Sequence, residues 1–175
     1  IEVTMIPGPT AAIMGLVLSG LPSGRFVFEG FLPVNKRMRK ERIRFLKNEV
    51  RTIVLYEAPH KLIYTLKDLY EEIGNRRIVL ARELTKKFEE IIRCTLEEAI
   101  EKYSVESPKG EFVLIVEGMD EKEAIESERQ TWNGISLKEH MEIYIKQGMS
   151  KKEAMKKVAD DRGISKREIY KELIN

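Results

Sequence analysis

The sequence predicts an α/β fold with a mixed, mostly parallel sheet of about five strands, flanked by helices and followed by a helical tail. Five short apolar runs alternate with segments of helical periodicity over residues 1–118. Very apolar runs such as 112–116 are typical of strands that are buried on both faces. After Gly118 the apolar runs give way to short, charged segments. The 175 residues are therefore expected to form one α/β domain with an appended tail.

The predicted strands are apolar runs that end at turn-forming residues. Pro33 and Pro59 end the first two runs, and Lys86-Lys87 marks a short turn that joins the third and fourth runs into a hairpin. The second and third runs flank a helical segment, which favours parallel pairing, whereas the hairpin makes the sheet mixed. The strands are expected at residues 26–32, 52–58, 77–85, 89–96 and 112–118.

The predicted helices carry apolar residues at spacings of three and four. The first follows a strand end and a Pro-Gly-Pro turn, and it is apolar nearly all round, so we expect it to be buried on most faces. The second is basic, with Ile43, Leu46 and Val50 on its inner face. The third has a leucine stripe and ends at Gly74. These helices are expected at residues 11–18, 36–49, 59–73 and 96–103.

The last third of the chain is expected to be a linker followed by a three-helix tail. Residues 119–135 are mostly charged or polar, as in a linker, and helices are expected at 136–147, 150–162 and 165–174. Serines at positions 150 and 165 are each followed three residues later by a glutamate, which is the capping-box pattern of a helix start.

Positive charge is concentrated in one segment. Residues 36–51 hold eight Lys or Arg and two Asp or Glu, a net charge of +6 in a chain whose formal net charge is +2. Such a concentration favours contact with an anion, although a basic helix face is equally compatible with simple solvation.

Several functional classes find no support in the sequence. No apolar stretch is long enough to span a bilayer. Cys94 is the single cysteine and the two histidines are far apart, so we expect neither a disulfide nor a metal cluster, and the composition suits a reducing cytosol. Phosphate-binding glycine loops and the serine-hydrolase motif do not occur. The chain starts without Met, from which we expect a fragment.

Polar turns at the strand ends are the remaining candidates for a site. They lie at residues 7–10, 56–60, 81–86 and 109–111. In open α/β sheets, ligands bind beyond the carboxyl ends of the strands. Polar residues there also satisfy loop backbone, so the pattern alone leaves a binding site and ordinary turns equally open.

Five blocks in order resemble the tetrapyrrole methylase superfamily. They read PGPTAA, GLPSGRFVFEGFLP, YEAPHKL, ARELTKKFEE and KGEFVLIVEG. The parts EGFLP and YEAPH are similar to the branch that acts on small-subunit ribosomal RNA, rather than to the corrin and porphyrin enzymes. The resemblance implies methyl transfer from S-adenosylmethionine, without a metal, to a cytidine 2′-hydroxyl in 16S ribosomal RNA. It also implies a cytoplasmic homodimer.

The same resemblance implies a two-domain protein with the cofactor in the cleft between the domains. The ATPIGN-like and AEDTR-like blocks of the first domain do not occur in this sequence. We therefore expect the chain to be the C-terminal part, with residues 1–118 as the second domain and the N-terminal cofactor-cleft domain absent.

The resemblance also assigns residues to roles. The cofactor residues that it implies are Gly8, Pro9, Thr10, Tyr56, Glu57, Ala58, Ala81, Arg82, Glu83, Leu84, Gly110 and Glu111. Contacts with RNA phosphates are expected from Lys36, Arg37, Arg39, Lys40 and Arg42. Four residues are candidates for a general base by their type only, and none is assigned as catalytic: Glu57, His60, Glu83 and Lys86.

Two other functions stay open at this point. A tetrapyrrole methyltransferase would keep the chemistry and change the substrate, and the basic segment is what disfavours it. A non-catalytic RNA- or protein-binding module would fit the helix–turn–helix pattern of residues 150–174, although the balanced charge of the tail argues against a nucleic-acid reader.

Overall fold

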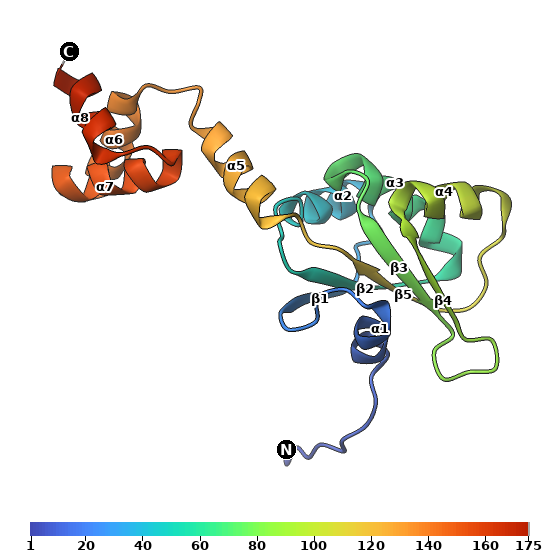
Figure 1. The fold of residues 1–175 in the computed structure, drawn as a ribbon. Helices are drawn as coiled ribbons and strands as arrows, with labels where there is room; N and C mark the ends of the chain where they lie inside the picture. The colour runs from blue at the N-terminus through green and yellow to red at the C-terminus, as the bar shows by residue number, and fades with distance from the viewer. Residues whose placement is uncertain (175) are drawn as a thin grey trace. The chain divides into compact units, whose positions relative to one another are not determined.

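The computed structural model describes the backbone of residues 1–174 and the side chains of residues 1–172. The chain divides into two compact units, Ile1–Met119 and Asp120–Asn175 (Figure 1). Among the described residues, no helix is both long and apolar enough to cross a membrane.

The first unit contains the five strands at nearly the predicted places. The strands are β1 (Phe26–Phe31), β2 (Thr52–Glu57), β3 (Arg77–Arg82), β4 (Glu90–Thr95) and β5 (Phe112–Val116). The helices are α1 (Ala11–Ser19), α2 (Lys36–Phe45), the short 3₁₀ turn η1 (Pro59–Lys61), α3 (Leu62–Ile73) and α4 (Leu96–Val105). Residues 1–10, where we predicted a strand end, have no regular structure.

The sheet is mixed, as predicted, but the prediction that it is mostly parallel is wrong. The strand order is β1-β2-β5-β3-β4, and β1 with β2 is the single parallel pair among the described strands. Strands β2 and β3 do run in the same direction, as the helix between them requires. However, β5 lies between them and runs the opposite way, so each of them pairs with it in the antiparallel sense.

Helices cover the two faces of the sheet unequally. Figure 1 shows α2, α3 and α4 on one face and α1 on the other. Alternate residues of each central strand enter the two cores: in β2, Ile53 and Leu55 contact the three-helix side, whereas Val54 packs with α1. Burial on both faces explains why these strands are continuous apolar runs.

Helix α1 is less buried than its sequence predicts. Ala12, Gly15 and Leu16 lie against the sheet, and a Cβ atom at Gly15 would come within 3.2 Å of Val113. The opposite side of the helix exposes apolar side chains, with Val17 at 67% exposure. The prediction of burial on most faces is therefore wrong, because a single helix on this face of the sheet has nothing described to cover its outer side. Val50, predicted for the inner face of α2, is exposed as well.

The described residues of the second unit form helices joined by short turns. Helices α6 (Leu137–Lys146), α7 (Lys151–Arg162) and α8 (Lys166–Ile174) match the three predicted helices. The polar stretch expected to be a linker contains a further helix, α5 (Glu121–Thr131), which begins at an Asp120 cap. Capping boxes begin α6 and α7, and the side chains of Ser165 and Glu168 make the same reciprocal hydrogen bonds before α8.

A buried histidine joins helices α6 and α7 in this unit. His140 has no exposed surface, its ring stacks on Trp132 with centroids 3.8 Å apart, and its Nδ1 accepts a hydrogen bond from Arg162 Nε at 3.2 Å. Asp161 Oδ2 lies 3.3 Å from its Nε2 and accepts a hydrogen bond from Tyr144 at 2.5 Å. Burial, reinforced by the Arg162 cation, lowers the pKa of His140, so the neutral ring is the form that the fold favours.

Candidate functional site

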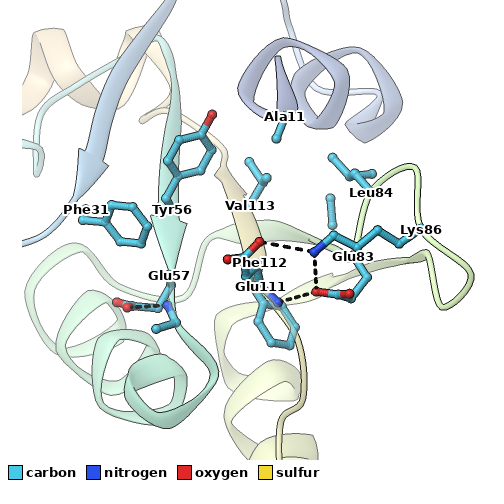
Figure 2. Close-up of a pocket in the computed structure, with 12 residues that line it drawn as sticks. Ala11, Phe31, Tyr56, Glu57, Glu83, Leu84, Lys86, Glu111, Phe112 and Val113 are labelled. Atoms are coloured by element: carbon cyan, nitrogen blue, oxygen red, sulfur yellow. Dashed lines mark hydrogen bonds and ion pairs between the residues drawn. The ribbon is translucent and has the colours of Figure 1, made fainter. Parts of the chain in front are cut away.

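A cavity lies at one end of the sheet, where β1, β2 and β3 end and β5 begins. Its volume is about 420 Å³, within the range of roughly 300–1,000 Å³ that is usual for small-molecule sites. Figure 2 shows Phe31 and Tyr56 on one side of it and Leu84 and Lys86 on the other. It is lined by Ala11, Phe31, Tyr56, Glu57, Ala58, Ala81, Glu83, Leu84, Lys86, Glu111, Phe112 and Val113.

Tyr56 connects the cavity to the start of α1. Its hydroxyl accepts a hydrogen bond from the backbone N–H of Ala12 at 3.1 Å. That N–H belongs to the first turn of the helix, where no carbonyl of the same helix can pair with it. The tyrosine ring contacts Phe28 edge-on and Phe31 at a tilt, with centroids 5.2 and 5.6 Å apart. Both ends of the Tyr56 side chain are therefore held in place.

Glu57 is a structural residue at the floor of the cavity. It is buried, and both of its carboxylate oxygens accept hydrogen bonds: Oε1 from the Ala58 N–H at 2.8 Å, and Oε2 from the Thr65 hydroxyl at 2.6 Å. A carboxylate with both oxygens occupied fixes the chain between β2 and α3. It is poorly placed to remove a proton from a ligand.

Glu83 fastens two loops of the cavity together. Its Oε1 accepts a hydrogen bond from the Glu111 N–H at 2.9 Å and lies 3.2 Å from Lys86 Nζ (Figure 2). Its own N–H donates to the Glu111 carbonyl at 3.1 Å. Glu83 and Thr85 both have positive φ angles, of 49° and 66°, which are uncommon for residues other than glycine. Such backbone geometry persists where surrounding bonds over-determine it, as these do.

Gly110 is required by this arrangement. Its φ angle is +80°, and a Cβ atom there would lie 2.5 Å from Cγ of Glu83. A side chain at this position would push the carboxylate away from the Glu111 N–H. The glycine therefore allows the loop after α4 to approach the loop after β3.

The electrostatics of this cluster keep both charges fixed near neutral pH. Hydrogen bonds from the Glu111 backbone and from Lys86 lower the pKa of Glu83, and the hydrogen bonds to Glu83 and Glu111 raise the pKa of Lys86. The pKa of each group is therefore moved away from pH 7, whereas the pKa of an acid–base catalyst usually lies close to it. The fourth candidate base, His60, is exposed in η1 and is not among the residues that line the cavity.

Most of the predicted cofactor residues meet in this cavity. Seven of them line it: Tyr56, Glu57, Ala58, Ala81, Glu83, Leu84 and Glu111. Gly110 supports it from behind, whereas Arg82 points to the other face of the sheet, where its guanidinium is 3.1 Å from Glu90. The exposed residues Gly8, Pro9 and Thr10 precede α1 and do not line the cavity, although the next residue does.

Sequence reasoning missed five lining residues: Ala11, Phe31, Lys86, Phe112 and Val113 were not among the predicted cofactor contacts. Phe31 is the informative omission. The β1–β2 register shifts between Phe28 and Gly30, and this irregularity brings Phe31 against Tyr56. A strict alternation of faces along the strand does not predict that placement.

The basic helix α2 is largely neutralised by carboxylates that are distant in sequence. Arg39 pairs with Asp68 at 2.7 Å and Lys40 with Glu71 at 2.6 Å, both on α3. Three of the five predicted RNA contacts therefore have ion-pair partners within the fold, since Arg42 also holds Glu29 through two bonds of 2.6 and 2.8 Å. The net charge of residues 36–51 is therefore larger than the unpaired positive charge on the surface of α2.

Lys36 and Arg37 remain available on the same helix. Both are exposed, and neither makes an ion pair with a side chain that the structure describes. They lie in the first turn, directly after the loop that follows β1. As for metals, no cluster of three or more His, Cys, Asp or Glu side chains occurs within the described part of the chain.

Comparisons with known proteins agree with the sequence blocks. Residues 1–100 match the family described as Tetrapyrrole (Corrin/Porphyrin) Methylases. A protein of Halalkalibacterium halodurans named "Ribosomal RNA small subunit methyltransferase I" is 46% identical over 170 residues, covering 97% of this chain and 58% of that protein. The protein of the same name from Bacillus subtilis is 44% identical over 168 residues, covering 96% and 57%.

Among solved structures, the methyltransferase CobJ aligns with a TM-score of 0.53 at 22% identity, over 67% of this chain and 51% of that one. This likeness concerns the fold alone. The chain spans about three fifths of the length of the curated relatives that match nearly all of it.

Proposed function

The chain belongs to the tetrapyrrole methylase family, and on that premise we propose that it forms one wall of the cofactor cleft of an S-adenosylmethionine-dependent methyltransferase. The substrate that we propose is a ribose 2′-hydroxyl of small-subunit ribosomal RNA. Support for the RNA comes from relatives at 46% and 44% identity that are named small-subunit ribosomal RNA methyltransferases, and the ribose 2′-hydroxyl is what the sequence resemblance implies. Because the chain spans about three fifths of those relatives, the activity is proposed for the whole protein.

The convergence of three loops on one cavity carries this proposal. The resemblance assigned cofactor contacts to loops that follow β2, follow β3 and precede β5, and all three line the same cavity of about 420 Å³. Its residues fit the donor. Leu84, Ala81 and Val113 would form an apolar wall for the adenine ring, and the exposed Glu111 carboxylate would attract the cationic end.

The chemistry that we propose needs positioning more than acid–base catalysis. S-adenosylmethionine, when bound, supplies a methyl group on a sulfonium, which is already a good leaving group. This chain's residues would hold the donor and exclude water, and such positioning can contribute several kcal/mol to the rate. The Glu83–Lys86–Glu111 cluster keeps the two loops rigid. We assign no general base to this chain.

RNA is a better candidate than a tetrapyrrole as the substrate. The relatives are named for ribosomal RNA, and Lys36 and Arg37 offer free cations for phosphates. Arg39, Lys40 and Arg42 contribute in our proposal mainly by fixing α2 on the fold. We propose a cytoplasmic location, because ribosomal RNA is the substrate.

We also propose a homodimer. The outer side of α1 presents Ile13, Val17 and Leu18 to solvent, and contiguous apolar side chains of this kind are typical of a contact surface. A second copy of the protein is the occupant that the family resemblance favours.

Methyl transfer tests the proposal. The protein would be prepared with the additional segment that its longer relatives contain. It would then be incubated with labelled S-adenosylmethionine and either small-subunit RNA or a porphyrin precursor. We expect label in RNA as a 2′-O-methyl nucleoside. Leu84→Glu, which puts a charge on the apolar wall, should abolish transfer, whereas the exposed Val105→Glu, away from the cavity and from the proposed RNA contacts, should not. Transfer to the porphyrin precursor alone would overturn the proposed substrate.

A further inference from the structure

Phe31 is an aromatic side chain at the rim of the cavity whose ring lies mostly in solvent. It is 67% exposed and yet lines the cavity. A scattered exposed apolar residue needs no explanation, but one beside a cavity marks a surface that contacts another molecule. The neighbouring Phe28 is exposed too, so the two rings together form an open aromatic surface at the end of β1.

The ring of Phe31 is supported from behind. Gly30, with a φ angle of +63°, and the register shift in β1 place Phe31 on Tyr56 with centroids 5.6 Å apart. Tyr56 is fixed in turn by Phe28 and by the hydrogen bond from Ala12. One side of Phe31 therefore rests on a rigid base, and the other side is free to stack.

We propose that Phe31 stacks on an unpaired base of the RNA substrate and thereby positions the nucleotide at the cavity. The inference rests on the function proposed above. Proteins that recognise RNA by sequence or modify its nucleotides bind bases that are out of the helical stack, and aromatic side chains receive those bases. A ring accepts any base, because every base has a π face. Phe31 is thus a positioning residue.

The charges nearby match this occupant. Lys36 and Arg37 follow Phe31 by five and six residues, and five residues of extended chain reach at most about 18 Å. Both cations are exposed and unpaired among the described side chains. In the proposed complex they would bind the phosphates that flank the base on Phe31. An open ring beside free cations is the combination that single-stranded nucleic acids bind.

Equilibrium binding of RNA to the protein extended as in the methyl-transfer assay tests the proposal. The probe is a short single-stranded RNA that carries 2-aminopurine, whose fluorescence reports stacking. Phe31→Ala should weaken binding by about 5- to 150-fold, the range that one base–aromatic stack contributes, and should abolish the quenching. Phe31→Leu should behave like Phe31→Ala, since it keeps apolar bulk without a ring, whereas Phe31→Trp should retain both signals.

Phe45→Ala is the matched control. Phe45 is 74% exposed, lies in the basic helix and does not line the cavity, so its loss should leave RNA binding unchanged. Equal binding by Phe31→Ala and the unchanged chain would overturn the stacking role alone, and so would full binding by Phe31→Leu. If the extended protein without substitutions does not bind RNA at all, the proposed substrate fails together with the stacking role. Binding of S-adenosylhomocysteine, measured in parallel, then shows whether the proposed cofactor site survives.

Discussion

Replacing Gly110 with alanine probes the link between the two cavity loops. Two costs follow from the structure. The φ angle of +80° is unfavourable for alanine by about 1–2 kcal/mol, and the new Cβ would lie 2.5 Å from Cγ of Glu83. Gly20 separates these costs, because its φ of +76° lies in the left-handed region and a Cβ atom there would meet no other atom within 4 Å. Gly20→Ala should therefore lower the free energy of unfolding by about 1–2 kcal/mol, and Gly110→Ala by more.

The excess should disappear when Glu83 is shortened. In a Glu83→Ala background the obstructing side chain is gone, so Gly110→Ala should cost only what Gly20→Ala costs. Urea unfolding followed by circular dichroism reports on both units, and fluorescence of the single tryptophan, Trp132, reports on the second unit. The substitutions should shift the dichroism transition of the first unit and leave the Trp132 transition in place. Gly110→Ala should also weaken binding of S-adenosylhomocysteine by roughly 10- to 100-fold, because the cavity loops move.

Two results would refute this reasoning. The first is an equal cost for Gly110→Ala and Gly20→Ala, which would mean that Glu83 does not restrict position 110. The second is an excess cost that persists in the Glu83→Ala background. If Gly110→Ala lowers stability as expected but leaves the ligand affinity unchanged, the contact between the loops does not contribute to cofactor binding.

Three further predictions concern charge, pH and self-association. Lys36→Glu and Arg37→Glu should each weaken RNA binding and lower the salt dependence of the affinity by about one phosphate contact, as read from binding at several salt concentrations. The pKa of His140 is lowered in the fold, so stability of the second unit should be full above the unfolded value of about 6.5 and decrease as pH falls below it. Trp132 fluorescence in urea would show this, and a persistent pH dependence in His140→Gln would contradict it. Val17→Asp should reduce self-association in sedimentation equilibrium, and it should leave the stability of the fold unchanged because Val17 is exposed. An unchanged molecular mass would count against the proposed dimer surface.

Local patterns predicted the elements well, and spatial arrangement less well. The apolar runs and capping signals placed every strand and most helices, because period and end chemistry are local properties. The insertion of β5 between β2 and β3 is a long-range pairing, and the sequence of residues 112–116 does not predict it. The exposure of Val17 could not be predicted either, because a helix that is apolar on all sides does not indicate which side faces solvent.

Much of the candidate site followed from the sequence because it lies at strand ends. The turns after β2 and β3 could be predicted, and they meet in one cavity. Two parts could not. The partners of the basic helix, such as Asp68 for Arg39, come from a different helix about thirty positions away, so a local charge count misses them. Phe31 reaches the cavity through an irregularity in β1 that strict alternation does not include.

The central claim is that the strand-end cavity holds the methyl donor, and nuclear magnetic resonance with labelled methyl groups tests it most directly. S-adenosylhomocysteine would be titrated into the protein extended as in the methyl-transfer assay, and the methyl signals of Leu84, Ala81 and Val113 followed. We predict that these three signals shift together and saturate, while those of Ala154 and Val158 in the second unit stay in place. Binding without shifts at the cavity, or no binding at all, would contradict the account.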